Sequence, residues 1–152
     1  MRGTGPTTRT RSALVEPGRG LLALTPWSEV ARLLVTRAQT AGAFTVTEVE
    51  APAGWQRPTY VHHALDECLY VVEGEVEAEL DDQDRPVRVP TGALLFVPRG
   101  VGRSLRNPGR VPGRLLLLQT PGRDEDVPPA TGVEFVTAPV PASAPRPSRR
   151  TS

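Results

Sequence analysis

The scarcity of cysteine in this sequence excludes internal disulfides. Among 152 residues there is one cysteine, Cys68, so the chain cannot form a disulfide with itself. A free cysteine without disulfides is typical of a reducing compartment, and we expect a cytoplasmic protein. No run of about 18 apolar residues is present, so we expect no membrane span and no membrane partner. Residues 1–20 hold no continuous apolar core, so we expect no secretory signal.

Lysine is missing from the sequence as well. All 18 basic residues are arginine, which is typical of a GC-rich genome. Seven of them lie in residues 1–19 and 146–150, whereas residues 20–145 hold 11 arginines and 16 acidic residues, a net charge of −5. Nucleic-acid binding requires a basic patch along the phosphate backbone. The acidic body therefore argues against nucleic acid as a partner.

Long helical patterns are the third absence. Only "SEVARLL" (28–34) could form a single helical turn. Short apolar runs with period-two alternation follow one another instead, separated by Gly and Pro turn signals about every 8–12 residues. Examples are "AFTVTEVEA" (43–51), "EVEAEL" (75–80) and "RLLLLQT" (114–120). This pattern predicts an all-β, antiparallel sandwich or barrel.

The length fits one domain, and composition divides it into four parts. Residues 1–18 and 139–152 lack a hydrophobic period, so we expect a disordered N-terminal arm and a disordered tail. Residues 19–120 hold the predicted strands of the barrel. Residues 121–138 read as a loop, with one short edge strand expected in "TGVEFVT" (131–137).

Two motifs in the central part resemble those of the cupin family. The first is Gly54-x5-Tyr60-x-His62-x4-Glu67-x6-Gly74, and its usual cupin form is G-x5-H-x-H-x3-4-E-x6-G. The second is Gly92-x5-Pro98-x-Gly100-x2-Arg103-x3-Asn107, usually G-x5-P-x-G-x2-H-x3-N. The resemblance covers about residues 43–120. It implies a jelly-roll β-barrel of two sheets with an internal pocket, and often a homodimer, which we expect here.

The sequence departs from the cupin motifs at two positions that usually bind metal. Cupins that hold a metal commonly use two histidines and a glutamate of the first motif and a histidine of the second. Tyr60 and Arg103 replace the first and the last of these histidines, so only His62 and Glu67 remain. Zinc, iron and manganese sites usually need three or four ligands. We therefore expect no metal cofactor.

The four residues at the metal-ligand positions could instead form an acid–base site. Tyr60 and His62 are two residues apart on a predicted strand, so both face one side and His63 faces the other. A guanidinium repels a cation by about 4 kcal/mol per pair of unit charges at about 4 Å, so Arg103 should pair with Glu67 instead. His62 could move a proton, while Glu67 orients it or acts as the base. Tyr60 could donate a proton to an enolate or leaving oxygen, and Arg103 could stabilise that oxygen.

This set suits isomerisation, cyclisation or dehydration of a small carbonyl compound. The chemistry resembles that of cupin-like cyclases in polyketide and other secondary-metabolite pathways. We expect the substrate to be bound by five further residues near the barrel interior or its mouth: Trp55, Gln56, Phe96, Leu105 and Gln119. The strand phase of Gln119 is ambiguous in the sequence.

Two other functions fit the same residues. One is a metal-dependent cupin enzyme, such as a dioxygenase, in which His62, Glu67 and Tyr60 would be the ligands. The other is a non-catalytic cupin that binds a small molecule or acts as an accessory protein, with the polar side chains satisfying one another in a filled interior.

Overall fold

The computed structural model describes residues 10–23, 25, 27, 29–122 and 133–135, and these form strands and no helix. Their order along the chain is β1 Leu21–Leu22, β2 Ala31–Val35, β3 Thr45–Ala51, β4 Gln56–His62, β5 Asp66–Glu73, β6 Glu75–Leu80, β7 Val87–Pro90, β8 Leu94–Val97, β9 Arg103–Arg106, β10 Gly113–Thr120 and β11 Val133–Phe135.

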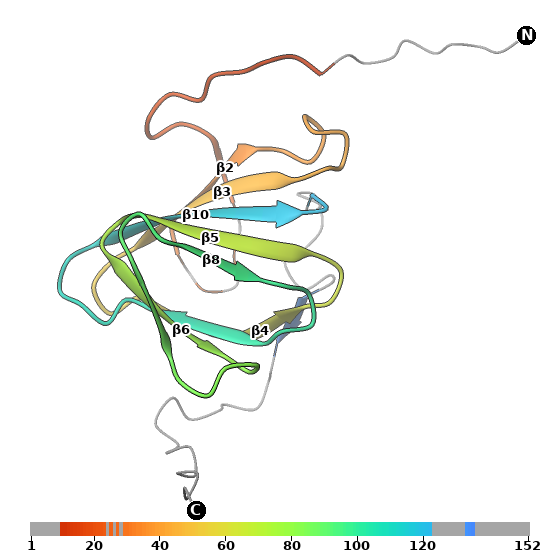
Figure 1. The fold of residues 1–152 in the computed structure, drawn as a ribbon. Helices are drawn as coiled ribbons and strands as arrows, with labels where there is room; N and C mark the ends of the chain where they lie inside the picture. Colours follow the sequence, from red (N-terminus) through yellow and green to blue (C-terminus); the bar gives the residue numbers. More distant parts are fainter. Residues whose placement is uncertain (1–9, 24, 26, 28, 123–132, 136–152) are drawn as a thin grey trace, which may run out of the picture.

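The strands build two antiparallel sheets that face each other. The six-stranded sheet has the order β1-β2-β3-β10-β5-β8, and the five-stranded sheet has the order β11-β4-β9-β6-β7. In Figure 1, β2, β3, β10, β5 and β8 follow one another from the top of the view, with β6 and β4 below them. This arrangement confirms the all-β, one-domain jelly-roll barrel that the sequence predicts.

Period-two alternation explains which side chains fill the barrel. In β10 every second residue is buried, from Gly113 through Leu115 and Leu117 to Gln119. In β5 the buried residues are likewise every second one, Glu67, Leu69 and Val71 among them. The interior apolar cluster draws on both sheets and consists of Ala31, Val49, Ala51, Trp55, Leu69, Val71, Val76, Ala78, Leu80, Val89, Val97, Leu105, Leu115 and Leu117.

The register gathers the buried polar residues at one end of this interior. Gln119 of β10 lies opposite Glu67 of β5. Each is the next inward-facing residue beyond a buried leucine of its strand, Leu117 in β10 and Leu69 in β5. In the other sheet Tyr60 of β4 lies opposite Arg103 of β9. Polar side chains from both sheets therefore meet at the same place, because each strand changes from apolar to polar at its inward-facing positions there.

The turns of the two motifs shape this barrel. Gly74, between β5 and β6, has φ of 76°, and a Cβ there would lie 2.8 Å from the Cα of Gly113. Only glycine adopts this conformation and permits this approach at low cost. Asn107, at the end of β9, is buried and donates hydrogen bonds from Nδ2 to the carbonyl oxygens of Ala51 and Val111. The motif residues outside the ligand positions thus have structural roles.

The structure tests several of the sequence predictions. The expected edge strand is present as β11, which pairs with β4. The single helical turn that 28–34 could form does not occur over 31–34, because strand β2 begins at Ala31 and pairs with β3. In the described part of the chain, no helix is long and apolar enough to cross a membrane. The predicted tail, 139–152, and residues 1–9 of the predicted arm lie outside the described residues.

Candidate functional site

A buried carboxylate, Glu67, is the centre of the polar cluster. Tyr60 donates its hydroxyl proton to Oε1 at 3.0 Å, and Arg103 Nη1 donates to the same oxygen at 2.9 Å. Gln119 Nε2 donates to Oε2 at 2.8 Å, and His62 Nε2 lies 3.5 Å from that oxygen. Both carboxylate oxygens are therefore occupied by donors that come from both sheets.

Strand β4 supplies Tyr60 and His62 to one face, as their spacing predicts. Tyr60 has an exposed fraction of 0% and His62 of 2%, whereas His63 is exposed. The two rings meet edge to face, with centroids 5.3 Å apart and an interplanar angle of 82°. The edge of one ring against the face of the other is a favourable arrangement for aromatic pairs. His63 is thus directed away from the cluster.

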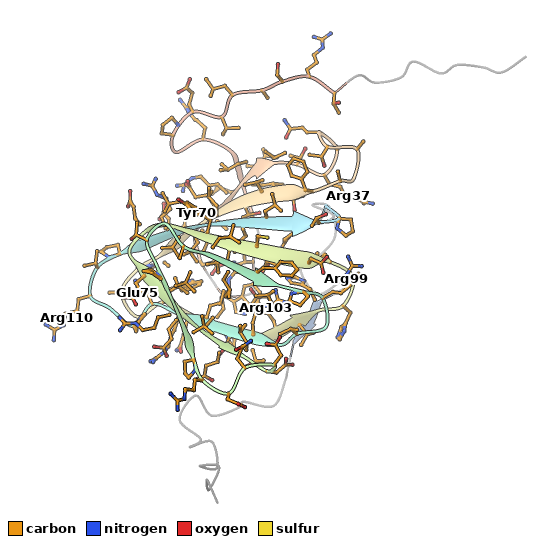
Figure 2. The ribbon with its side chains drawn as sticks, in the orientation of Figure 1. Arg37, Tyr70, Glu75, Arg99, Arg103 and Arg110 are labelled. Carbon is orange, nitrogen blue, oxygen red and sulfur yellow. The ribbon has the colours of Figure 1, made fainter. Side chains whose placement is uncertain are left out.

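Arg103, the first residue of β9, forms the ion pair with Glu67 that the sequence predicts. Its side chain is fully buried, and Nη2 donates to the carbonyl oxygen of Val101 at 2.9 Å. The guanidinium carbon lies 5.3 Å from the centre of the Tyr60 ring, within the range of a cation–π contact. Figure 2 shows Arg103 inside the barrel, whereas Arg110 projects from a loop at its periphery.

The pKa values of Glu67 and Tyr60 shift in opposite directions. Burial alone would raise the pKa of Glu67, but the hydrogen bond and charge of His62, the Arg103 guanidinium and Gln119 together lower it well below its usual range. Burial and the negative charge of Glu67 raise the pKa of Tyr60, and the nearby guanidinium groups offset only part of this. Near neutral pH the site therefore holds a carboxylate beside a neutral phenol.

Two polar atoms of the cluster have no hydrogen-bond partner. His62 Nδ1 and Arg103 Nε are buried and have no hydrogen-bond partner in the described structure. Buried polar groups are usually paired, and an unpaired one at such a place indicates a ligand, a water molecule or a catalytic role. With Nε2–H directed at Glu67, Nδ1 of His62 carries a free lone pair, and the Nε–H of Arg103 is a free donor. One base and one cationic donor are thus available.

The structure places the predicted substrate-binding residues in different environments. Gln119 faces the cluster, which resolves its ambiguous phase. Trp55 and Leu105 are buried in the apolar cluster. The prediction is wrong for Phe96, whose side chain is 55% exposed, because Val97 takes the inward position of β8. Gln56 is exposed between the buried residues Trp55 and Arg57, and its role in substrate binding stays a prediction.

Sequence reasoning missed a second buried ion pair next to the cluster. Arg57 of β4 donates from Nε to Glu29 Oε2 at 3.0 Å and pairs with Oε1 through Nη2. Glu29 also accepts a hydrogen bond from Trp55 Nε1 at 2.8 Å. Strict alternation would turn Arg57 away from the face of Tyr60, but the β4–β9 register shifts between these two residues. The signal in the sequence is Pro58, since proline within a strand often marks a bulge.

Comparison with known proteins agrees with this fold. Residues 47–118 match the family model described as the cupin domain. Together with the two-sheet barrel and the motif positions on it, this match identifies residues 47–118 as a cupin domain. Protein SchB of Streptomyces halstedii is 35% identical over 86 residues, which are 57% of this chain and 60% of SchB. The match thus spans less than two thirds of that relative.

Solved structures share the fold. The polyketide cyclase RemF from Streptomyces resistomycificus superposes with a TM-score of 0.63 and 23% identity, over 72% of this chain and 80% of RemF. Oxalate decarboxylase from Bacillus subtilis superposes with a TM-score of 0.57 and 16% identity, over 66% of this chain and 28% of that enzyme. Proteins described as a cyclase and as a decarboxylase thus have this fold, so the fold alone does not define the reaction.

The residues at the cupin metal positions do not fit a divalent ion. No group of three or more His, Cys, Asp and Glu side chains within the described ranges is arranged to hold one. The raised pKa of Tyr60 keeps the phenol protonated, and its proton is directed to Glu67. Both oxygens of Glu67 are engaged, and the Arg103 guanidinium stands 2.9 Å from one of them. A cation in this place would face a fixed positive charge.

Proposed function

We propose that the barrel contains a metal-independent acid–base site that catalyses isomerisation, cyclisation or dehydration of a small carbonyl compound. The observation that carries this proposal is the pair of open atoms, His62 Nδ1 and Arg103 Nε, beside a carboxylate that stays ionised. A base and a cationic donor are what enolisation of a ketone requires, and both His62 and Arg103 contact the same carboxylate.

Each residue has a distinct part in this chemistry. His62 takes a proton from the carbon next to the carbonyl through Nδ1, and Glu67 orients the ring through Nε2 and stabilises the imidazolium that forms. The lowered pKa of Glu67 makes it a weak base, which favours this orienting role. The Nε–H of Arg103 binds the enolate oxygen. The enolate then takes the proton back on the other face of the same carbon or at another carbon, which is isomerisation, or its carbon attacks a second carbonyl, which closes a ring.

The proton on His62 also completes the cyclisation. In ring closure the new alkoxide takes the proton from His62, and loss of water from the resulting alcohol gives the dehydrated product. Tyr60, a neutral phenol whose ring centre lies 5.3 Å from the guanidinium carbon of Arg103, serves as a second proton donor in this proposal. Every step returns the residues to their starting protonation state, so no oxidant or reductant is needed.

The relatives favour a substrate from secondary metabolism. The structural neighbour RemF is described as a polyketide cyclase, and both it and SchB come from Streptomyces species. A polyketide intermediate carries several carbonyl groups with acidic hydrogens between them, which is the substrate that enolisation at His62 would use. We extend this class of substrate to the chain as part of the proposal, together with assembly as a homodimer and a cytoplasmic location.

Complete burial favours a second function, that of a non-catalytic binding or accessory cupin. Tyr60, His62, Glu67 and Arg103 are each at most 2% exposed. Trp27 packs on the Tyr60 ring, with centroids 5.0 Å apart. A substrate therefore reaches His62 only if covering side chains move, whereas a filled interior needs no such movement.

Exchange of carbon-bound hydrogen separates these functions. We would incubate the protein with chelator and a series of enolisable aryl ketones and 1,3-diketones in D₂O, and follow loss of the α-proton by NMR. Catalysed exchange should fall by about 10²–10⁴-fold in His62→Ala, the usual range for a general base. His63→Ala, on the same strand but facing outward, is the matched control and should keep full activity. Absence of exchange with every ketone would favour the accessory function, and exchange that chelation removes would favour a metal enzyme.

A further inference from the structure

The buried pair Arg57–Glu29 lies next to Tyr60 and outside the set of residues used above. The side chain of Glu29 is 1% exposed and that of Arg57 4%. A buried ion pair costs much desolvation free energy and gives little net stability, so its presence calls for another reason. Glu29 precedes β2 in the chain, and its three donors belong to Trp55 and Arg57, at the start of β4. Glu29 thus holds Arg57 in place by a contact between the segment before β2 and the start of β4.

Arg57 is aimed at the hydroxyl of Tyr60. Nη1 lies 3.5 Å from Tyr60 Oη, and the guanidinium carbon lies 5.8 Å from the centre of the ring. A contact of 3.5 Å is at the limit for a hydrogen bond, so Arg57 acts mainly through its charge. Trp27 covers the guanidinium at 4.3 Å and keeps it in place. The oxygen lone pairs of Tyr60 thus face a cation, while its proton is directed to Glu67.

We propose that Arg57, anchored by Glu29, is a positioning residue that fixes the direction and sets the acidity of the Tyr60 hydroxyl. The role as positioning residue rests on the proposed acid–base function, in which Tyr60 is a proton donor. The charges of Arg57 and Glu29 act on the Tyr60 hydroxyl whether or not a substrate is bound. Arg57 without Glu29 would be a strong local cation, and Glu29 without Arg57 would be an uncompensated anion. The pair together gives Tyr60 a moderate positive field.

The direction of the effect follows from the groups around Tyr60. The charged and titratable side chains that face it are Arg57 and His62 from β4, Glu67 from β5 and Arg103 from β9. A cation favours the phenolate and lowers the pKa of a tyrosine, and an anion raises it. Arg57 lies closer to Tyr60 than Glu29 does, because Glu29 contacts the far side of the same guanidinium through Nε and Nη2.

The test is a titration of Tyr60 alone. The chain has two tyrosines, Tyr60 and Tyr70, so a Tyr70→Phe background leaves one. Tyr70 is 39% exposed on the outer face of β5, and its replacement should leave the cluster intact. Growth with 3,5-difluorotyrosine, a more acidic phenol, brings the titration of position 60 into an accessible pH range. It is then followed by absorbance and ¹⁹F NMR on the full chain.

The variants should move the titration in opposite directions. Arg57→Gln should raise the midpoint by about one pH unit, and Glu29→Gln should lower it by less, because Glu29 lies farther from the hydroxyl. The double variant should lie above the parent and below Arg57→Gln, because the net field of the pair at Tyr60 is positive. Arg106→Gln breaks an exposed ion pair with Glu77 and is the matched control, with no shift expected. Should Arg57→Gln not fold, the midpoint of the double variant is compared with that of Glu29→Gln, and it should be higher.

Two results would overturn the proposal. If both single variants move the midpoint toward that of the free phenol, the pair only keeps water out, and its role is structural. If neither variant moves it, the field of Arg57 does not reach Tyr60. The titration uses no substrate, so failure of the proposed catalysis would leave these shifts unchanged. The two proposals therefore fail separately.

Discussion

Replacing Arg103 by methionine should destabilise the protein strongly and in a pH-dependent way. Methionine keeps the length of the side chain but removes the charge that lies 2.9 Å from Glu67. Removing one partner of a buried ion pair typically costs about 3–5 kcal/mol, because the other charge stays buried without compensation. At about 2–4 °C per kcal/mol for a chain of this size, the melting temperature should fall by roughly 6–20 °C near neutral pH.

The pH dependence follows from the sign of the pKa shift of Glu67. In the parent the folded pKa lies below the ordinary value of 4.5, so Glu67 contributes stability above that value and loses it as the pH falls below it. In Arg103→Met burial is no longer offset by the guanidinium, and the folded pKa of Glu67 should rise. The variant then lacks the part of the stability above pH 4.5 that the guanidinium contributes, while His62 and Gln119 still act on Glu67. The difference between parent and variant should therefore grow from acid to neutral pH.

Urea unfolding followed by tryptophan fluorescence measures this difference at several pH values between 4 and 7. Glu67→Gln combined with Arg103→Met removes both charges, and this double variant should regain part of the stability that Arg103→Met loses. A loss below about 1 kcal/mol that is the same at every pH would refute the reasoning. It would mean that Glu67 is solvated in the folded chain and that the ion pair carries little free energy.

Two further predictions concern the departures from the cupin motifs and the turns. Tyr60→His combined with Arg103→His should create a Zn²⁺ site in which both new histidines, His62 and Glu67 are the ligands. Calorimetry should show tight Zn²⁺ binding by this variant and none by the parent. Equal binding by both proteins would contradict the argument that the residues of the parent do not fit a metal. Gly74→Ala should destabilise the protein by more than about 1 kcal/mol in urea unfolding. Gly54→Ala is its control: φ there is also positive, at 81°, but an added Cβ meets nothing within 4 Å, so it should cost less.

Local pattern in the sequence predicts the strands and the centre of the site. Alternation places Tyr60 and His62 on one face of a strand, and the motif spacing pairs Glu67 with Arg103. These predictions hold because a strand repeats every two residues wherever the ladder is regular. Gln119 remains ambiguous in the sequence because a run of four leucines precedes it, and such a run has no apolar–polar alternation.

The missed residues lie where the ladder is irregular or where the pattern misleads. Arg57 shares a face with Tyr60 because of the bulge near Pro58, which breaks the period of two. Glu29 belongs to a stretch whose apolar spacing resembles a helical turn, and its partners are 26 and 28 residues away. Phe96 illustrates the opposite error, since its hydrophobicity suggests the interior although it lies on the outer face of an edge strand.

The position of Glu67 between the sheets restricts which substitutions this barrel can accept during evolution. Its donors come from β4 and β9 of one sheet and from β10 of the other. A single substitution at any of these positions leaves a charge or a donor stranded in the interior, whereas paired substitutions do not. A barrel with a metal-binding histidine at position 103 and the present barrel with Arg103 are thus separated by single variants of low stability. A path that avoids these intermediates requires loss of the metal and gain of the opposing cation nearly together, with the carboxylate kept.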